Sequence, residues 1–186
     1  MKLSPNLSGP MGNGISAGAV NAALQQPFPV QQQKMTNWCW AACTSAVCAF
    51  YQDATQPSQE QLVAQELQMP VCNSTPLLPP CNKIFDFGQA LDDVGHFVPP
   101  VLNKIDPASI AQSISNNQPV GFQLNIPGIG GHAVVVITAS QDGSGKWYVT
   151  VADPSDGSCP VMSWDEFGSN YRMTGGYWER AYTIKP

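Results

Sequence analysis

The chain has 186 residues, a length that suits one domain with a substantial hydrophobic core. Apolar residues make up 43% of the sequence, as in a globular fold, whereas charged residues make up only 11%, against roughly 25% in an average soluble domain. The net charge of −5 and the absence of a basic cluster argue against a nucleic-acid partner, and no apolar run approaches the roughly 20 residues that span a bilayer.

The N-terminal segment differs in composition from the rest of the chain. Residues 1–27 are rich in Gly, Ser, Asn and Pro and show no helical or strand period, so we expect a flexible leader. The lysine near its start is not followed by a continuous apolar segment, so the leader does not have the form of a signal peptide. Six cysteines and few charges are nevertheless typical of an exported protein. We therefore expect secretion, or delivery by a specialised secretion system, and a domain covering residues 28–186.

The first half of this domain, about residues 28–118, is predicted to be helical. Residues 38–51 are nearly all apolar or small and contain neither Gly nor Pro, which indicates a helix buried on most sides. Ser58 and Gln61 form a capping-box pattern at the start of a second helix. Two further short helices are predicted after the potential N-cap residues Asp86 and Asp106.

The second half, about residues 119–186, is predicted to form an antiparallel sheet. Its β-type runs are separated by Gly, Asp and Ser turns; they are VGFQLNI (120–126), HAVVVITA (132–139), KWYVTVAD (146–153) and YWERAYTI (177–184). Helices followed by an antiparallel sheet predict an α+β fold in two halves. A cleft between the halves is the natural place for a site assembled from both.

Cys39 is the best candidate for a reactive thiol. It lies at the start of the predicted buried helix, where unpaired N–H groups and the helix dipole stabilise a thiolate. Cys43 and Cys48 lie further along the same helix, away from the polar residues 34–37 that precede it. The alternative is a structural cysteine that packs as a small apolar group. A metal site formed by Cys39, Cys43 and His132 would lack a fourth ligand.

A catalytic thiol needs a base, and the chain has only two histidines. His132 opens a predicted strand after a glycine-rich segment, whereas His96 follows a helix stop, where we expect a surface or packing role. Asp153 ends the next strand, and the turn between the two strands predicts a hairpin that brings His132 and Asp153 together. Without this catalytic role, His132 would be a packed strand residue and Asp153 the start of a turn.

A glutamine completes the candidate site. Gln33 precedes Cys39 by six residues, so its amide can donate a hydrogen bond beside the sulfur. Together with the backbone N–H of Cys39 it would form an oxyanion hole. Gln31 and Gln32 are competitors that spacing alone does not exclude.

Cys72 and Cys81 bracket a proline-broken loop without a periodic core pattern, so we predict a disulfide between them. The alternative is a pair of free thiols in a reducing compartment. The pairing of Cys43, Cys48 and Cys159 stays open.

The order of these residues resembles that of papain-like cysteine peptidases. The resemblance is closer to a bacterial branch that includes the C70 effector peptidases and C39-like domains, on the motifs NWCWAAC, GHAVVVI and DPSDG, with CN at 81–82 and the later SWDEF. It covers about residues 28–186. It implies a papain-like fold with a Cys39–His132–Asp153 triad and Gln33 in the oxyanion hole.

The resemblance also implies a function. It predicts a cysteine endopeptidase that acts on a protein or peptide substrate, needs no metal or organic cofactor, and is an exported bacterial protein or effector; we expect a monomer. One alternative is an acyltransferase or transglutaminase-like enzyme with the same triad, and another is a binding module on a degenerate peptidase fold. Asn37 and Trp38 replace the Gly and Ser that papain has before its nucleophile, and an Asp replaces its Asn. Papain's subsites have no recognisable match, so its substrate preference does not carry over.

Overall fold

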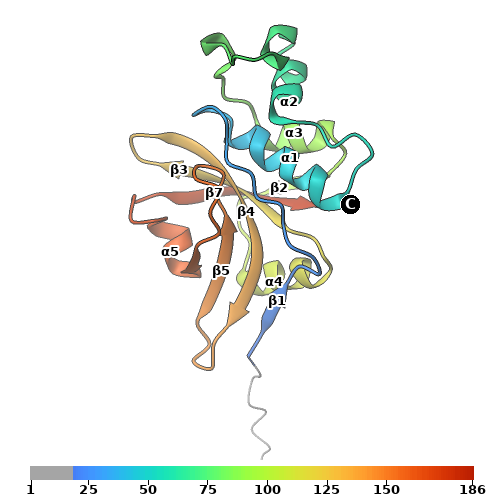
Figure 1. Ribbon diagram of the computed structural model, residues 1–186. Coiled ribbons are helices and arrows are strands. Elements are labelled where there is room, and N and C mark those ends of the chain that lie inside the picture. Colours follow the sequence, from blue (N-terminus) through green and yellow to red (C-terminus); the bar gives the residue numbers. More distant parts are fainter. Residues whose placement is uncertain (1–18) are drawn as a thin grey trace, which may run out of the picture.

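The computed structural model describes residues 19–186 (Figure 1). These residues form five α-helices, two short 3₁₀ segments and a seven-stranded sheet in the order β2-β7-β3-β4-β5-β6, with β1 paired to β4. The strands are β1 (Asn21–Ala23), β2 (Phe97–Leu102), β3 (Val120–Ile126), β4 (Gly130–Gln141), β5 (Trp147–Ala152), β6 (Val161–Ser163) and β7 (Tyr177–Ile184). The helices are α1 (Cys39–Tyr51), α2 (Gln59–Glu66), α3 (Phe87–Asp93), α4 (Pro107–Ser115) and α5 (Trp164–Ser169), and the 3₁₀ segments are Pro70–Asn73 and Pro79–Cys81.

The helices begin where the sequence supplies caps or a buried apolar run. The predicted capping box is present at α2, where Ser58 and Gln61 bond each other's backbone N–H groups. Asp86 and Asp106 cap α3 and α4. All residues of α1 except two are buried, which agrees with a helix enclosed on most sides.

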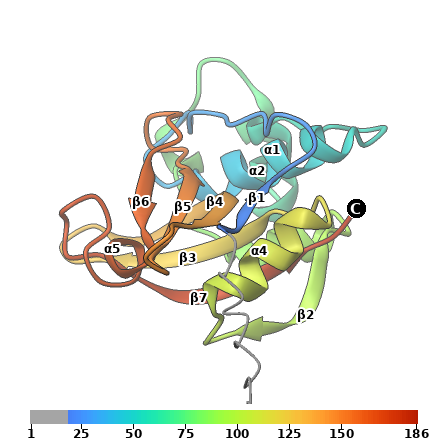
Figure 2. The ribbon, with the colours of Figure 1, turned by 90° about the horizontal axis from the view of Figure 1, so that it is seen from below.

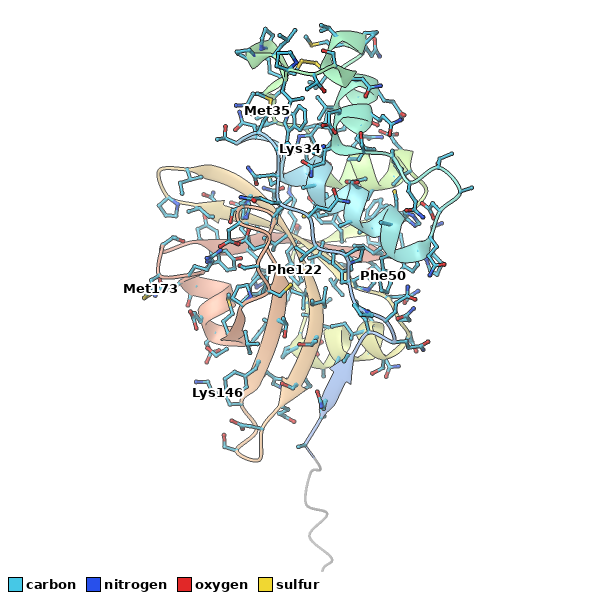
Figure 3. All side chains as sticks on the ribbon, viewed as in Figure 1. Lys34, Met35, Phe50, Phe122, Lys146 and Met173 are labelled. Carbon is cyan, nitrogen blue, oxygen red and sulfur yellow. A yellow bond between two sulfur atoms is a disulfide. The ribbon has the colours of Figure 1, made fainter. Side chains whose placement is uncertain are left out.

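The sheet separates two apolar clusters because successive side chains of a strand point to opposite faces. On β4, Ala133 and Val135 join the cluster formed with α1, α2 and α3, whereas Val134 and Val136 join the cluster formed with α4 and α5. Figure 3 labels one aromatic side chain from each cluster, Phe50 and Phe122. Figure 2 shows that β5 and β6 run across the direction of β3 and β7, so the sheet is strongly twisted. Helix α1 is thus held against one face of β4.

The start of the domain lies earlier than the expected boundary at residue 28. Strand β1 pairs antiparallel with β4, Asn21 opposite Ser140, and Ala22 is buried. A three-residue strand is too short to show a period in the sequence. Residues 1–18 of the expected leader lie outside the described residues.

The division into a helical and a sheet half agrees with the structure, except for two elements. Strand β2 lies in the expected helical half but pairs with β7 at the edge of the sheet. Its register shifts between Val98 and Leu102, around two prolines that cannot donate ladder hydrogen bonds, which is why the run did not read as a strand. Helix α5 lies in the expected sheet half, where Ser163 accepts from the Glu166 N–H. No helix within residues 19–186 has the length and hydropathy to cross a membrane.

Candidate active site

Cys39 is the first residue of α1. The N-cap residue Trp38 makes no side-chain capping bond, so the first backbone N–H groups of the helix are left for other partners. One turn further on, the Cys43 thiol donates to the carbonyl oxygen of Ala133 at 3.4 Å, which ties α1 to β4 beside His132. Cys43 is therefore a packing residue next to the site, and burial raises the pKa of its thiol well above the usual value.

The loop that precedes α1 is held by the loop that the disulfide closes. Cys72 and Cys81 form a disulfide in the structure, and the Trp38 indole N–H donates to the Cys81 carbonyl oxygen at 2.8 Å. The backbone N–H of Asn37 donates to Asn82 Oδ1 at 2.9 Å, and the Asn37 amide donates to the Asn82 carbonyl at 3.0 Å. The CN motif thus has a structural role, because it orients the residues just before Cys39.

His132 and Asp153 lie together, as the hairpin argument predicted. Strands β4 and β5 pair with Val135 opposite Ala152, and His132 Nε2 is 2.7 Å from Asp153 Oδ1. Both residues are buried, and Asp153 is only 1% exposed. Since Nε2 bonds the carboxylate, Nδ1 is the ring nitrogen that is left for the Cys39 sulfur.

The charges of these three groups favour a thiolate–imidazolium pair. Burial raises the pKa of Cys39, but the hydrogen bond and charge of His132, with backbone N–H groups of Ala133 and Trp40, outweigh it and bring the pKa below the usual 9.0. Burial lowers the pKa of His132, but the hydrogen bonds and charges of Asp153 and Cys39 raise it to about 9. Burial also raises the pKa of Asp153, yet His132, the Ser155 N–H and Tyr171 hold it well below its usual range.

Two residues that the sequence analysis missed hold the carboxylate of Asp153. The Tyr171 hydroxyl donates to Asp153 Oδ2 at 2.7 Å, and Arg172 Nη1 donates to the same oxygen at 2.9 Å. Arg172 also bonds Asp156 at 2.8 Å. Both residues follow α5 in a turn where Arg172 and Met173 have positive φ; Figure 3 labels Met173 there. Neither helical nor strand periodicity marks such a turn. In the sequence, only the positive charge of Arg172 could have indicated a partner for Asp153.

Gln33 lies near the site, but its amide has other partners in this geometry. Its backbone N–H donates to Pro154, which places it beside the Asp153 turn, and its side chain lines the same cavity as His132. The amide nitrogen donates to the carbonyl oxygens of Met35 at 3.0 Å and Thr36 at 2.7 Å, and Oε1 has no partner within residues 19–186. Both amide hydrogens are thus engaged, and donation to an oxyanion requires one of them to be released or shared.

The two competing glutamines have different environments. Gln31 donates to Ser45 Oγ at 3.0 Å, and Gln32 contacts the Ser155 carbonyl oxygen at 3.5 Å. Neither lines the cavity beside His132. The spacing argument for Gln33 therefore agrees with its position, while its role as a donor stays a prediction.

His96 has a partner of its own, although a surface or packing role was expected. It is buried, and its Nε2 lies 2.7 Å from Asp53 Oδ2, close to Cys48 near the other end of α1. This second group of Cys, His and Asp differs from the first in its electrostatics. Burial, followed by the charge of Asp53, raises the pKa of Cys48 to about 12, so its thiol stays neutral and is a poor nucleophile.

Two cavities flank the Cys39–His132 pair. One of about 520 Å³ is lined by His132, Asp153 and the apolar side chains of Ile126 and Ile129. The other, of about 460 Å³, is lined by Cys39 together with aromatic and charged residues, Trp40, Phe85, Asp86, Glu179 and Arg180. Cys39 and His132 therefore lie between two cavities, and each cavity is large enough to hold a side chain of a bound polypeptide.

A thiol at the start of a buried helix, facing a strand histidine that a carboxylate orients, is the arrangement of papain-like cysteine peptidases. The sequence model of the family described as "Papain-like cysteine protease AvrRpt2" (Peptidase_C70) matches residues 20–172. The chain belongs to this family and is a papain-like cysteine peptidase.

The fold agrees with a solved structure. A crystal structure described as a C39-like peptidase from Bacillus anthracis superposes with a TM-score of 0.55 at 16% identity, over 89% of this chain and 98% of that one. At this identity the likeness concerns the fold alone. No curated protein matches the chain.

Proposed function

We propose that the chain is an exported bacterial cysteine endopeptidase in which Cys39 is the nucleophile, His132 the acid and base, and Asp153 the residue that orients the histidine. The observation that carries this proposal is the buried His132–Asp153 hydrogen bond of 2.7 Å beside a thiol whose pKa is lowered. Of the four cysteines outside the disulfide, only Cys39 has a lowered thiol pKa.

The reaction uses the charges already present in the site. The Cys39 thiolate attacks the carbonyl carbon of the scissile bond, and the resulting oxyanion accepts hydrogen bonds from N–H groups at the start of α1. The His132 imidazolium donates its Nδ1 proton to the leaving amine, which releases the first product and leaves a thioester. Neutral His132 then takes a proton from water as the water attacks the thioester, and Cys39 is regenerated as a thiolate.

Gln33 is proposed as the second oxyanion donor. Its side chain is on the same side of the site as His132 and, unlike Gln31 and Gln32, lines the cavity there. One amide hydrogen of Gln33 that now bonds a neutral carbonyl oxygen could bond the substrate oxygen instead when negative charge develops there. A charged acceptor forms the stronger hydrogen bond.

The substrate is proposed to be a protein segment in extended conformation. Such a segment can lie across both cavities with its scissile bond over Cys39, since side chains of an extended chain alternate in direction. Export is supported by the cysteine content, the low charge and the Cys72–Cys81 disulfide, which would form in an oxidising compartment.

Hydrolysis in ¹⁸O-labelled water tests the reaction and separates it from acyl transfer. The purified protein is incubated with unfolded casein, and the peptides are analysed by mass spectrometry. We expect internal cleavages whose new C-terminal carboxylates contain ¹⁸O, with no cleavage by Cys39→Ser and normal cleavage by Cys159→Ser. Acyl transfer would instead join an added amine to the new C-terminus. If folded wild-type protein neither cleaves nor transfers, the proposal is wrong and a binding module on this fold is favoured.

A further inference from the structure

The group formed by Cys48, Asp53 and His96 lies outside the active site. One ligand atom from each residue lies within 4.8 Å of the others. Cys48 and His96 are 1% and 4% exposed, whereas the Asp53 side chain is 28% exposed. We propose that these three side chains bind a divalent transition-metal ion of the zinc class.

The set of donor atoms suits such an ion. A sulfur, an imidazole nitrogen and a carboxylate oxygen are all zinc ligands, and three of them leave a fourth tetrahedral position for water. Ions at these bond lengths hold their ligand atoms roughly 3.4–3.6 Å apart. His96 Nε2 and Asp53 Oδ2, now 2.7 Å apart, would need to separate by somewhat less than 1 Å.

The second nitrogen of His96 is already held as metal-binding histidines require. Nδ1 donates to the carbonyl oxygen of Lys185 at 2.7 Å, and the Tyr51 ring stacks on the imidazole at a centroid distance of 5.0 Å. A backbone carbonyl on one ring nitrogen fixes the tautomer and directs the other nitrogen at the metal. Here that other nitrogen, Nε2, points at Asp53.

The electrostatics of this region favour a cation. Cys48 lies in the last turn of α1, which ends with Gln52 in the left-handed region, and the negative end of the helix dipole faces the group. A cation bound there would interact favourably with the carbonyl groups at this end of the helix.

Access is available from solvent. A cavity of about 430 Å³ is lined by Cys48 and Asp53, with the polar side chains of Thr55, Gln61, Gln65 and Asp93 around it. The ion would join the end of α1 to the residue before β2 and, through Lys185, to the end of β7. The proposal thus concerns a structural site at the C-terminal end of α1 and does not depend on the proposed function.

Cobalt(II) is the probe, because a cobalt–thiolate bond has a charge-transfer absorption. The titration uses Cys39→Ala protein, since Cys39 and His132 could themselves bind a metal. We expect one equivalent of Co²⁺ to give the charge-transfer band. The band should disappear in Cys39→Ala/Cys48→Ser and persist in Cys39→Ala/Cys159→Ser, the matched control with an exposed cysteine removed.

Two further measurements keep the proposal falsifiable if the buried Cys48 variant folds poorly. Asp53→Asn, in the same Cys39→Ala background, should weaken Co²⁺ binding at least tenfold. Zn²⁺ at about a hundredfold excess over its Kd should raise the Tm of the Cys39→Ala protein by roughly 5–10 °C. A folded Cys39→Ala protein with no band and no Zn²⁺-dependent change in Tm would overturn the proposal and leave a buried hydrogen-bonded group. A band that persists without Cys48 would overturn it as well.

Discussion

Replacing Asp153 with Asn tests whether the carboxylate charge, and not only its shape, supports the base. Asn retains an oxygen that can accept from His132 Nε2. Its amide nitrogen would then take the place of Oδ2, which now accepts from Tyr171 and Arg172. The Tyr171 hydroxyl can turn and accept, but a guanidinium has no acceptor, so Arg172 would face another donor.

The size of the effect follows from the pKa of His132. The hydrogen bonds and charges of Asp153 and Cys39 raise this pKa from 6.5 to about 9. Catalysis needs the imidazolium, so activity of the wild type should fall as the pH rises through about 9, while the low-pH limb follows the lowered pKa of Cys39. Without the carboxylate charge, the decrease in activity at high pH should occur at least about one pH unit lower. Turnover at neutral pH should fall by about a hundredfold or more, because the acid–base contribution is largely lost.

Steady-state kinetics of Asp153→Asn between pH 5 and 10 would measure both changes. The matched variant is Asp153→Asn/Arg172→Gln, in which the Gln oxygen can accept from the Asn amide. It should recover about tenfold in turnover, the equivalent of one restored hydrogen bond. Arg172→Gln alone should change little, because Gln can still donate to Asp153. An Asp153→Asn enzyme with nearly normal turnover and an upper limb still near pH 9 would refute the role of the charge.

Three further predictions concern the nucleophile and its loop. Limiting iodoacetamide should label Cys39 and abolish activity before the more exposed Cys159 reacts; peptide mapping that ties inactivation to Cys159 would contradict this. Gln33→Ala should lower kcat by about a hundredfold to a thousandfold with KM nearly unchanged. Gln32→Ala, the control, should change kcat little. Equal kcat values for the two variants would exclude Gln33 as an oxyanion donor. Asn82→Ala should destabilise the fold by about 2–3 kcal/mol, because it removes two side-chain hydrogen bonds to Thr36 and Asn37 in the loop that precedes α1. Unchanged thermal unfolding would show that other contacts hold this loop.

Local sequence patterns predicted the elements that depend on local chemistry. The caps at Ser58, Asp86 and Asp106 mark three helix starts, because a side-chain oxygen that accepts from the helix N–H groups is a local interaction. The runs at 120–126 and 177–184 coincide with β3 and β7. Strand β2 was missed because its prolines conceal the strand pattern and its pairing partner lies about 80 residues away in sequence, a separation that periodicity does not report.

The same distinction holds for the site. His132 and Asp153 could be paired in advance because a hairpin relates them, and turn chemistry is readable from sequence. Tyr171 and Arg172 reach Asp153 from a turn after α5, and no rule of spacing connects them to it. The partners of Gln33 were also unforeseen, because its hydrogen bonds to nearby carbonyl oxygens depend on the particular path of the loop.

Helix α1 shows why residue type alone does not define a catalytic thiol. It has a cysteine near each end, and beside each cysteine lies a histidine that bonds an aspartate. At the N-terminal end, Cys39 meets helix N–H groups and the imidazolium of His132, so negative charge on sulfur is stabilised. At the C-terminal end, burial and then the charge of Asp53 raise the pKa of Cys48 to about 12, and the negative end of the helix dipole lies on the same side. The opposite environments at the two ends of one helix are therefore consistent with the proposed nucleophile at Cys39 and the proposed metal ligand at Cys48.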